Sequence, residues 1–147
     1  MKPTKTLLAI LTDSHLMPID DCIHRITYRV YEDEDGFEIV YRHSVSYCAP
    51  WATKEERKPR IEKLTVRASA ALTEQLRMFK GMAVPLFPQG GNIAPDAGCL
   101  SMKLFAPLTT ATFVWSFAST PNGYGGLDRA AKMIIDEIQK EMDHEEV

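Results

Sequence analysis

Three arginines recur at spacings that would bring them together if residues 22–48 form a β-hairpin. Arg25 and Arg29 are an even number of positions apart, and side chains separated in this way on a strand share one face. Pairing across the hairpin brings Arg42 to the same face. Guanidinium groups present five N–H donors in a planar fork that matches phosphate and carboxylate oxygens. The pattern therefore indicates a surface that contacts anions.

Aromatic side chains accompany these cations. Tyr31 shares the arginine face, and a second predicted hairpin places Lys103 and Phe105 on the equivalent face. Rings interleaved with cations are typical of sheets that bind nucleic acids or other phosphate-bearing ligands. The candidate ligand- or partner-binding residues are therefore Arg25, Arg29, Tyr31, Arg42, Lys103 and Phe105.

Two other interpretations of this face stay open. Its arginines can pair with Glu32 or Glu38 on a solvated surface, where an ion pair is worth only ~0.2–1 kcal/mol. Alternatively, the apolar side chains on the face favour a contact between subunits of a homo-oligomer. These apolar residues are Ile23, Val40, Phe105 and Val114.

A glycine-rich segment before the last predicted helix is a second candidate for anion binding. Free backbone amides and the helix dipole can hold an anion at such a position. The segment lacks the lysine and hydroxyl of a P-loop and does not fit GxGxxG, so a plain turn is the favoured interpretation. The residues of this candidate loop are Asn122, Gly123, Gly125 and Gly126.

Metal ligands are present, but the expected register separates them. Cys22 and His24 have strand spacing, and His43 and Cys48 lie on the second strand of the hairpin. A two-residue turn would leave His24 and His43 roughly 13 Å apart at ~3.3 Å per residue, and Cys48 on the other face. Two ligands do not close a structural zinc site, so we predict no metal.

Catalytic motifs are not recognisable in this chain. Asp13, Ser14 and His15 have the residue types of a triad, but adjacent residues do not supply its geometry, and neither GxSxG nor HExxH occurs. We predict no catalytic residue and no cofactor. The long Pro- and Gly-rich loop at 84–98 is where an active site would be expected, with Asn92, Asp96 and the following Cys99 as candidates.

The first hairpin is the clearest structural signal. Two alternating runs, 22–32 and 37–48, flank an acidic turn that ends in Gly36. A two-residue turn at Asp35 and Gly36 would place Arg29 directly opposite Arg42, an unfavourable pair of like charges. A four-residue loop would shift the pairing by two and leave the division into two faces unchanged.

Helical periodicity is expected in three other segments. Residues 4–11 predict a short amphipathic helix. Residues 61–83 predict a long helix, preceded by a capping box at Thr53 and Glu56. A competing interpretation takes Leu64, Val66 and Ala68 as alternating strand residues. Residues 127–142 predict a closing helix with one apolar stripe.

The expected architecture is a single α+β domain over residues 1–147. Its sheet is mainly antiparallel and four-stranded, built from two β-hairpins, 22–48 and 100–117. Helices cover one face of this sheet, and the order of elements is α-ββ-α-ββ-α. Each half of the domain would then contain one hairpin and a helix.

Composition restricts the classes of function. The net charge of −3 gives no overall attraction to polyanions, so nucleic-acid contact would need a local basic patch. Three widely spaced cysteines favour a cytoplasmic protein over a disulfide framework. No apolar stretch reaches the ~20 residues of a membrane span, so no membrane partner is expected.

Function is predicted only as a class. The favoured hypothesis is a small non-enzymatic binding or regulatory protein, similar to an inhibitor or adaptor, that uses the sheet face or the 84–98 loop on a protein partner. One alternative is an enzyme or sensor for a small anionic ligand such as a phosphate or nucleotide, and nucleic acid is a further candidate partner. Another alternative is a homo-oligomeric structural subunit.

Overall fold

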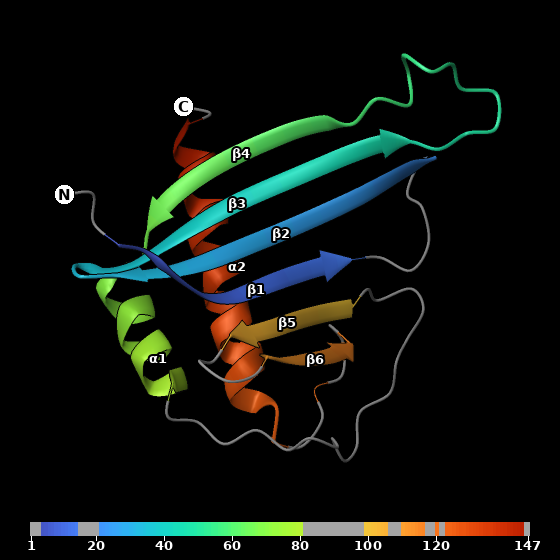
Figure 1. Ribbon diagram of the computed structural model, residues 1–147. Coiled ribbons are helices and arrows are strands. Elements are labelled where there is room, and N and C mark those ends of the chain that lie inside the picture. Colours follow the sequence, from blue (N-terminus) through green and yellow to red (C-terminus); the bar gives the residue numbers. More distant parts are fainter. Residues whose placement is uncertain are drawn as a thin grey trace.

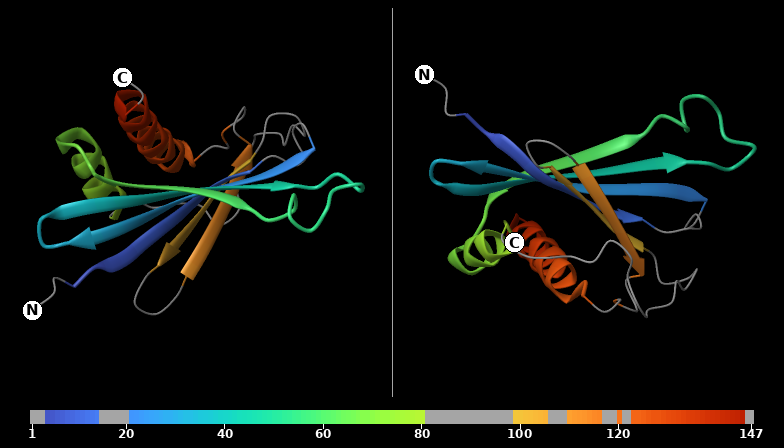
Figure 2. Two further views of the ribbon diagram at one scale, coloured as in Figure 1. Left: turned by 90° about the horizontal axis from the view of Figure 1, so that it is seen from above. Right: turned by 60° about the horizontal axis from the view of Figure 1, so that its bottom comes forward.

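A computed structural model describes residues 4–14, 21–80, 99–105, 110–116, 120 and 123–145 of the chain. In these residues, one antiparallel sheet of six strands has the order β4-β3-β2-β1-β5-β6. Two helices lie on the same side of this sheet (Figures 1 and 2). The elements are β1 Thr6–Ser14, β2 Cys22–Asp33, β3 Gly36–Tyr47, β4 Arg60–Arg67, α1 Ala70–Lys80, β5 Cys99–Phe105, β6 Thr110–Ser116 and α2 Gly125–Glu145.

The predicted four-stranded sheet with three helices is wrong, and the first error lies at residues 4–11. This segment is β1, which hydrogen-bonds to β2 on one side and β5 on the other. Ala9 and Leu11 point into the core, whereas Ile10 and Thr12 point to the other face. A run of five apolar residues fits a buried strand as well as a helix, and pairing with two neighbours decides between them.

The predicted helix over 61–83 is also wrong in its first half. Residues 60–67 form β4, in which Leu64 and Val66 pair with Tyr41 and Ile39 on β3, so the competing strand interpretation is correct. The helix begins only after Ser69, whose hydroxyl accepts a hydrogen bond of 3.2 Å from the amide of Leu72.

The capping box at Thr53 and Glu56 forms, although it caps no helix. The Glu56 amide donates to the Thr53 hydroxyl at 3.2 Å, and the Thr53 amide donates to the Glu56 carboxylate at 3.3 Å. These contacts close a turn at residues 54–57, in the connection between β3 and β4. The predicted start of a helix at this motif is wrong, because the turn leads into β4.

Both predicted hairpins are present, and the register of the first differs by two residues. Asp33 pairs with Gly36, which leaves Glu34 and Asp35 in the turn. The Asp35 amide donates to the Asp33 carboxylate at 2.9 Å, and Gly36 adopts a φ of 141° that other residues rarely adopt. The predicted Arg29–Arg42 opposition is therefore wrong, but the division into faces is confirmed.

The two helices lie against one face of the sheet, which we call the inner face. The core lies between this face and the helices. The α2 stripe expected from the sequence is buried there, and Trp115 on β6 donates an indole hydrogen bond of 2.9 Å to Asp128. No helix in the described ranges is long and apolar enough to cross a membrane. The largest fully buried side chains include Leu11, Val30, Phe37, Ile39, Leu72, Leu76, Leu100, Met102, Trp115, Leu127, Ile134 and Ile138.

Candidate binding face of the sheet

The outer face is the side of the sheet that neither described helix covers (Figure 2). Alternation along the strands sends Arg29 to this face, because its neighbours Tyr28 and Val30 are buried in the core. Arg29 pairs with Val40 on β3 and with Ile10 on β1. Polar and basic side chains therefore stand in rows across the outer face, with apolar residues between them.

Four cations form a diagonal line across this face, which we call the basic diagonal. Lys63 on β4 pairs with Arg42 on β3, and Arg42 pairs with Thr27 on β2. Arg29 is two residues further along β2, and Ile10 separates it from Lys103 on β5. The basic diagonal therefore consists of Lys63, Arg42, Arg29 and Lys103, and Arg25 is exposed beside it.

A shallow pocket lies at the centre of the basic diagonal. Its volume is about 280 Å³, and Val40 contributes the apolar part of its lining. The guanidinium groups of Arg29 and Arg42 and the ammonium group of Lys63 supply positively charged hydrogen-bond donors, which suit a phosphate or carboxylate oxygen. The neutral hydroxyl of Thr27 can donate as well. The lining residues are Thr27, Arg29, Val40, Arg42 and Lys63.

The cations around the pocket are unpaired in the described part of the chain. Arg29, Arg42 and Lys63 have no ion pair or hydrogen bond with any described residue, and all three side chains are exposed. Like charges at this spacing repel each other, so an anion bound among them would relieve an unfavourable interaction.

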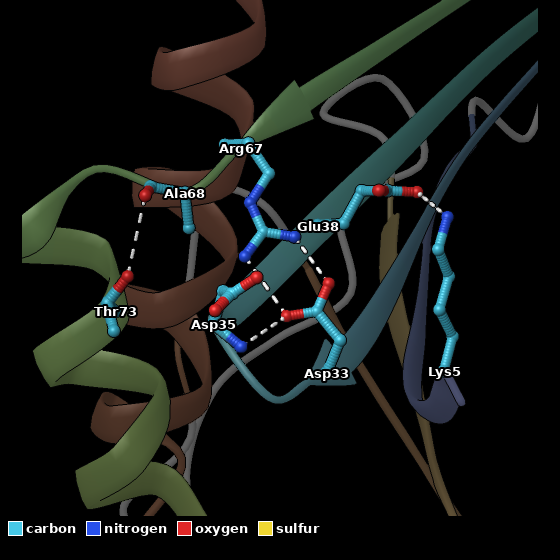
Figure 3. Close-up of polar contacts among 7 residues, drawn as sticks. All are labelled: Lys5, Asp33, Asp35, Glu38, Arg67, Ala68 and Thr73. Carbon is cyan, nitrogen blue, oxygen red and sulfur yellow. Dashed lines mark hydrogen bonds and ion pairs between the residues drawn. The ribbon is translucent and has the colours of Figure 1, made fainter. Parts of the chain in front are cut away.

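Acidic groups at the hairpin end of the same face are already paired (Figure 3). Glu38 accepts an ion pair of 2.8 Å from Lys5, and Asp33 accepts a hydrogen bond of 3.0 Å from Arg67. This hydrogen bond lowers the pKa of the Asp33 carboxyl to about 2. The charge of Arg67 is therefore neutralised locally, and neither acid compensates the basic diagonal.

The structure brings all six predicted binding residues to the outer face. Tyr31 lies two residues beyond Arg29 on β2, and Phe105 lies two residues beyond Lys103 on β5. The Lys103 ammonium is 5.3 Å from the centroid of the Phe105 ring, within the range of a cation–π contact. Both rings are partly exposed.

Sequence reasoning missed Lys63, the cation that closes the pocket on the β4 side. The error followed from the helix assigned to residues 61–83, which gave Lys63 no place in the sheet. The alternation of Leu64 and Val66 was the signal that could have placed it, because a strand residue next to an inward side chain points to the opposite face.

The candidate anion loop receives no support from its surroundings. Asn122 lies outside the described residues, Gly123 is exposed with a φ of 90°, and Gly125 and Gly126 begin α2. Asp128 already places a carboxylate in the first turn of this helix, where it complements the helix dipole. A second anion there would meet a like charge.

The two histidines of the rejected metal site are much closer than expected. Their Nδ1 and Nε2 atoms are 3.0 Å apart, so the predicted separation of roughly 13 Å is wrong. The register shift puts His43 opposite Ile26, which is diagonal to His24 on the same face. Within the described ranges, no three His, Cys, Asp or Glu side chains are grouped to hold a metal ion.

Most of the other residues singled out in the sequence lie outside the described part of the chain. His15, Asn92, Asp96 and the rest of the 84–98 loop lie outside the described residues. Cys99 is buried at the start of β5.

Comparison of the chain with protein-family models, curated proteins and solved structures found no match.

Proposed function

We propose that this chain is a small non-enzymatic binding protein whose outer face engages an anionic partner. The observation that supports this most strongly is the pocket within the basic diagonal, where Arg29, Arg42 and Lys63 converge without acidic partners in the described chain. Both described helices lie on the opposite face, so neither of them blocks a partner from the outer face (Figure 2). A role as an inhibitor or adaptor in the cytoplasm belongs to the same proposal.

The proposal is tested by charge reversal on the outer face with a matched reversal on the helix side. Arg29→Glu with Arg42→Glu removes the two pocket arginines. Arg129→Glu with Lys140→Glu makes the same change in net charge at exposed positions of α2. Elution from immobilised heparin, a generic polyanion, is then compared along a salt gradient.

The wild type and the α2 variant should elute at similar salt, whereas the outer-face variant should elute much earlier. The melting temperature should change little in either variant, because exposed substitutions usually alter stability by less than about 0.5 kcal/mol. Equal elution of both variants would show that the outer face does not recognise anions.

A small phosphate-bearing ligand is a second candidate, favoured by the pocket itself. Its volume of about 280 Å³ is near the lower end of the range for ligand sites. A thermal-shift screen with phosphate, nucleotides and phosphorylated metabolites tests this candidate. Stabilisation by a mononucleotide that the arginine variant loses would favour a small ligand over a larger partner.

A further inference from the structure

We propose that the anionic partner of the outer face is a single-stranded nucleic acid, an inference that rests on the proposed function. Its phosphates would follow the basic diagonal, and its bases would lie against an apolar strip beside it. This apolar strip consists of Tyr31, Leu7 and Phe105. Three features of the outer face support the assignment: the length of the diagonal, the position of the strip and the distribution of charge.

The basic diagonal is too long for a single compact anion. Lys63 on β4 and Lys103 on β5 are four inter-strand steps apart in the sheet order, and steps of about 4.8 Å give a span of about 19 Å. A phosphate in the central pocket contacts Arg29 and Arg42 but cannot reach both ends. A linear polyanion can contact the entire line.

The apolar strip lies on one side of the basic diagonal. β2 and β5 both pair antiparallel with β1, so they run in the same direction. Tyr31 follows Arg29 by two residues and Phe105 follows Lys103 by two residues, so both rings are displaced to the same side. Leu7, which pairs with Tyr31, lies on the strand between them.

A strip of this kind matches the chemistry of a nucleic acid strand. A single strand presents phosphates along one edge and flat bases along the other, and bases stack on aromatic rings with ~1–3 kcal/mol per base. An acidic peptide or a sulfated polysaccharide would contact the cations but has no bases that stack on the rings. The rings are therefore the feature that distinguishes the partners.

Much of the acidic charge of the described chain lies in α2, on the other side of the sheet. The α2 sequence contains six Asp or Glu residues and three Lys or Arg residues, and α2 lies on the inner side of the sheet. On the outer face, Glu38 and Asp33 are paired with Lys5 and Arg67. A polyanion is therefore steered to the outer face even though the net charge is −3.

The experiment compares one polyanion that has bases with two that have none. Binding of a fluorescently labelled oligothymidylate, of heparin and of poly-glutamate is measured for the wild type and for Tyr31→Leu with Phe105→Leu. Leucine keeps apolar area on the strip but removes the rings. Tyr31→Phe, which keeps its ring, and Ile23→Ala, which changes an exposed apolar residue away from the strip, are the matched controls.

We expect the leucine double variant to bind the oligonucleotide about tenfold or more weakly and to bind heparin as the wild type does. Tyr31→Phe and Ile23→Ala should retain oligonucleotide affinity within about twofold. A plot of log affinity for the oligonucleotide against log salt concentration has a negative slope. Arg29→Ala with Arg42→Ala should make this slope shallower by about 1.4, since each neutralised phosphate contributes about 0.7. Circular dichroism and melting curves establish that each variant is folded.

The outcomes separate this inference from the proposed function. In one outcome, the arginine variant loses affinity for heparin and for the oligonucleotide, but the leucine variant loses both affinities equally or keeps both. The outer face would then bind anions without contacting bases, so the proposed function would stand and this inference would fail. Binding of poly-glutamate in preference to the oligonucleotide would assign the face to an acidic protein and overturn the inference. If the arginine variant loses nothing, both the inference and the proposed function fail.

Discussion

His43 lies on the inner face among titratable groups from both neighbouring strands. His24 on β2 approaches its Nε2 atom to 3.0 Å, Glu62 on β4 lies opposite it, and the Tyr41 ring is 6.4 Å away on β3. Burial lowers the pKa of His43, the nearby His24 lowers it further, and Glu62 opposes both effects. The folded protein therefore keeps this imidazole neutral to a lower pH than the unfolded chain does.

This pKa shift predicts a loss of stability in mild acid. Below the unfolded pKa of about 6.5, the unfolded chain binds more protons at this position, so the free energy of unfolding decreases as the pH falls toward the folded pKa. Above about 6.5 the contribution is fully present. We expect the wild-type melting temperature to be lower at about pH 5.5 than at about pH 7.5. The melting temperature of His43→Gln should decrease less over the same range.

His144 provides the control for this titration. His144→Gln makes the same substitution at an exposed position in the last turn of α2 and is measured at the same pH values. Calorimetric melts of the three proteins across the pH range measure the difference. An unchanged pH dependence in His43→Gln would show that another group is responsible.

Two glycines at element boundaries make different demands on the backbone. Gly36 begins β3 with a φ of 141°, and Gly125 begins α2 with open space where a Cβ would lie. We expect Gly36→Ala to lower the free energy of unfolding by about 1–3 kcal/mol, because an L side chain strains this conformation. Gly125→Ala should be neutral or stabilising by up to about 1 kcal/mol, since it restricts the unfolded chain. Urea denaturation of both variants checks the contrast, and equal effects would contradict it.

Ser69 lies between the end of β4 and the start of α1. Its hydroxyl accepts from the Leu72 amide, and its own amide donates to the Glu137 carboxylate at 3.2 Å, which links the start of α1 to α2. We expect Ser69→Ala to destabilise the protein by about 1 kcal/mol through loss of the N-cap. Ser44→Ala, on the outer face, should remain within about 0.5 kcal/mol of the wild type in the same urea titration. Similar losses in both variants would argue against a capping role.

Local pattern identified the elements whose contacts are also local. The two hairpins pair within a short stretch of chain, and the apolar stripe of α2 follows from spacings of three and four within one segment, although α2 packs against the distant α1 and β4. β1 and β4 were misassigned because their apolar residues fit both periods, and only pairing with distant strands selects the extended form. The misassignment of β4 also affected the candidate site. Its arginines were placed on the correct face, but Lys63 on β4 was not.

The order of the strands is a property of the whole molecule that no segment specifies. β1 lies between β2 and β5, so it joins the first hairpin to the second and makes one sheet of both. This insertion places Lys103 and Phe105 on the same surface as Arg29 and Tyr31. The sequence analysis predicted equivalent faces for the two hairpins but could not predict their distance, because it had no strand to place between them.

Charge on the two sides of the sheet also bears on self-association. A twofold dimer through the outer face would bring the pocket cations of one copy toward those of its partner, because such an interface uses the same patch twice. Exposed apolar residues on this face, Ile23 and Ile61, favour association. Arg29, Arg42 and Lys63, which have no ion pair with any described residue, oppose it. At low ionic strength the repulsion is screened least.

We therefore expect the free protein to be a monomer of 16.6 kDa at low salt, from dilute to concentrated solution. Light scattering coupled to gel filtration measures this mass. A dimer that persists at low salt and dissociates in Ile23→Asp with Ile61→Asp would instead assign the outer face to a contact between subunits. In that case the cations would have to be compensated within the dimer, and charge reversal at Arg29 and Arg42 would alter its stability rather than the binding of an anion.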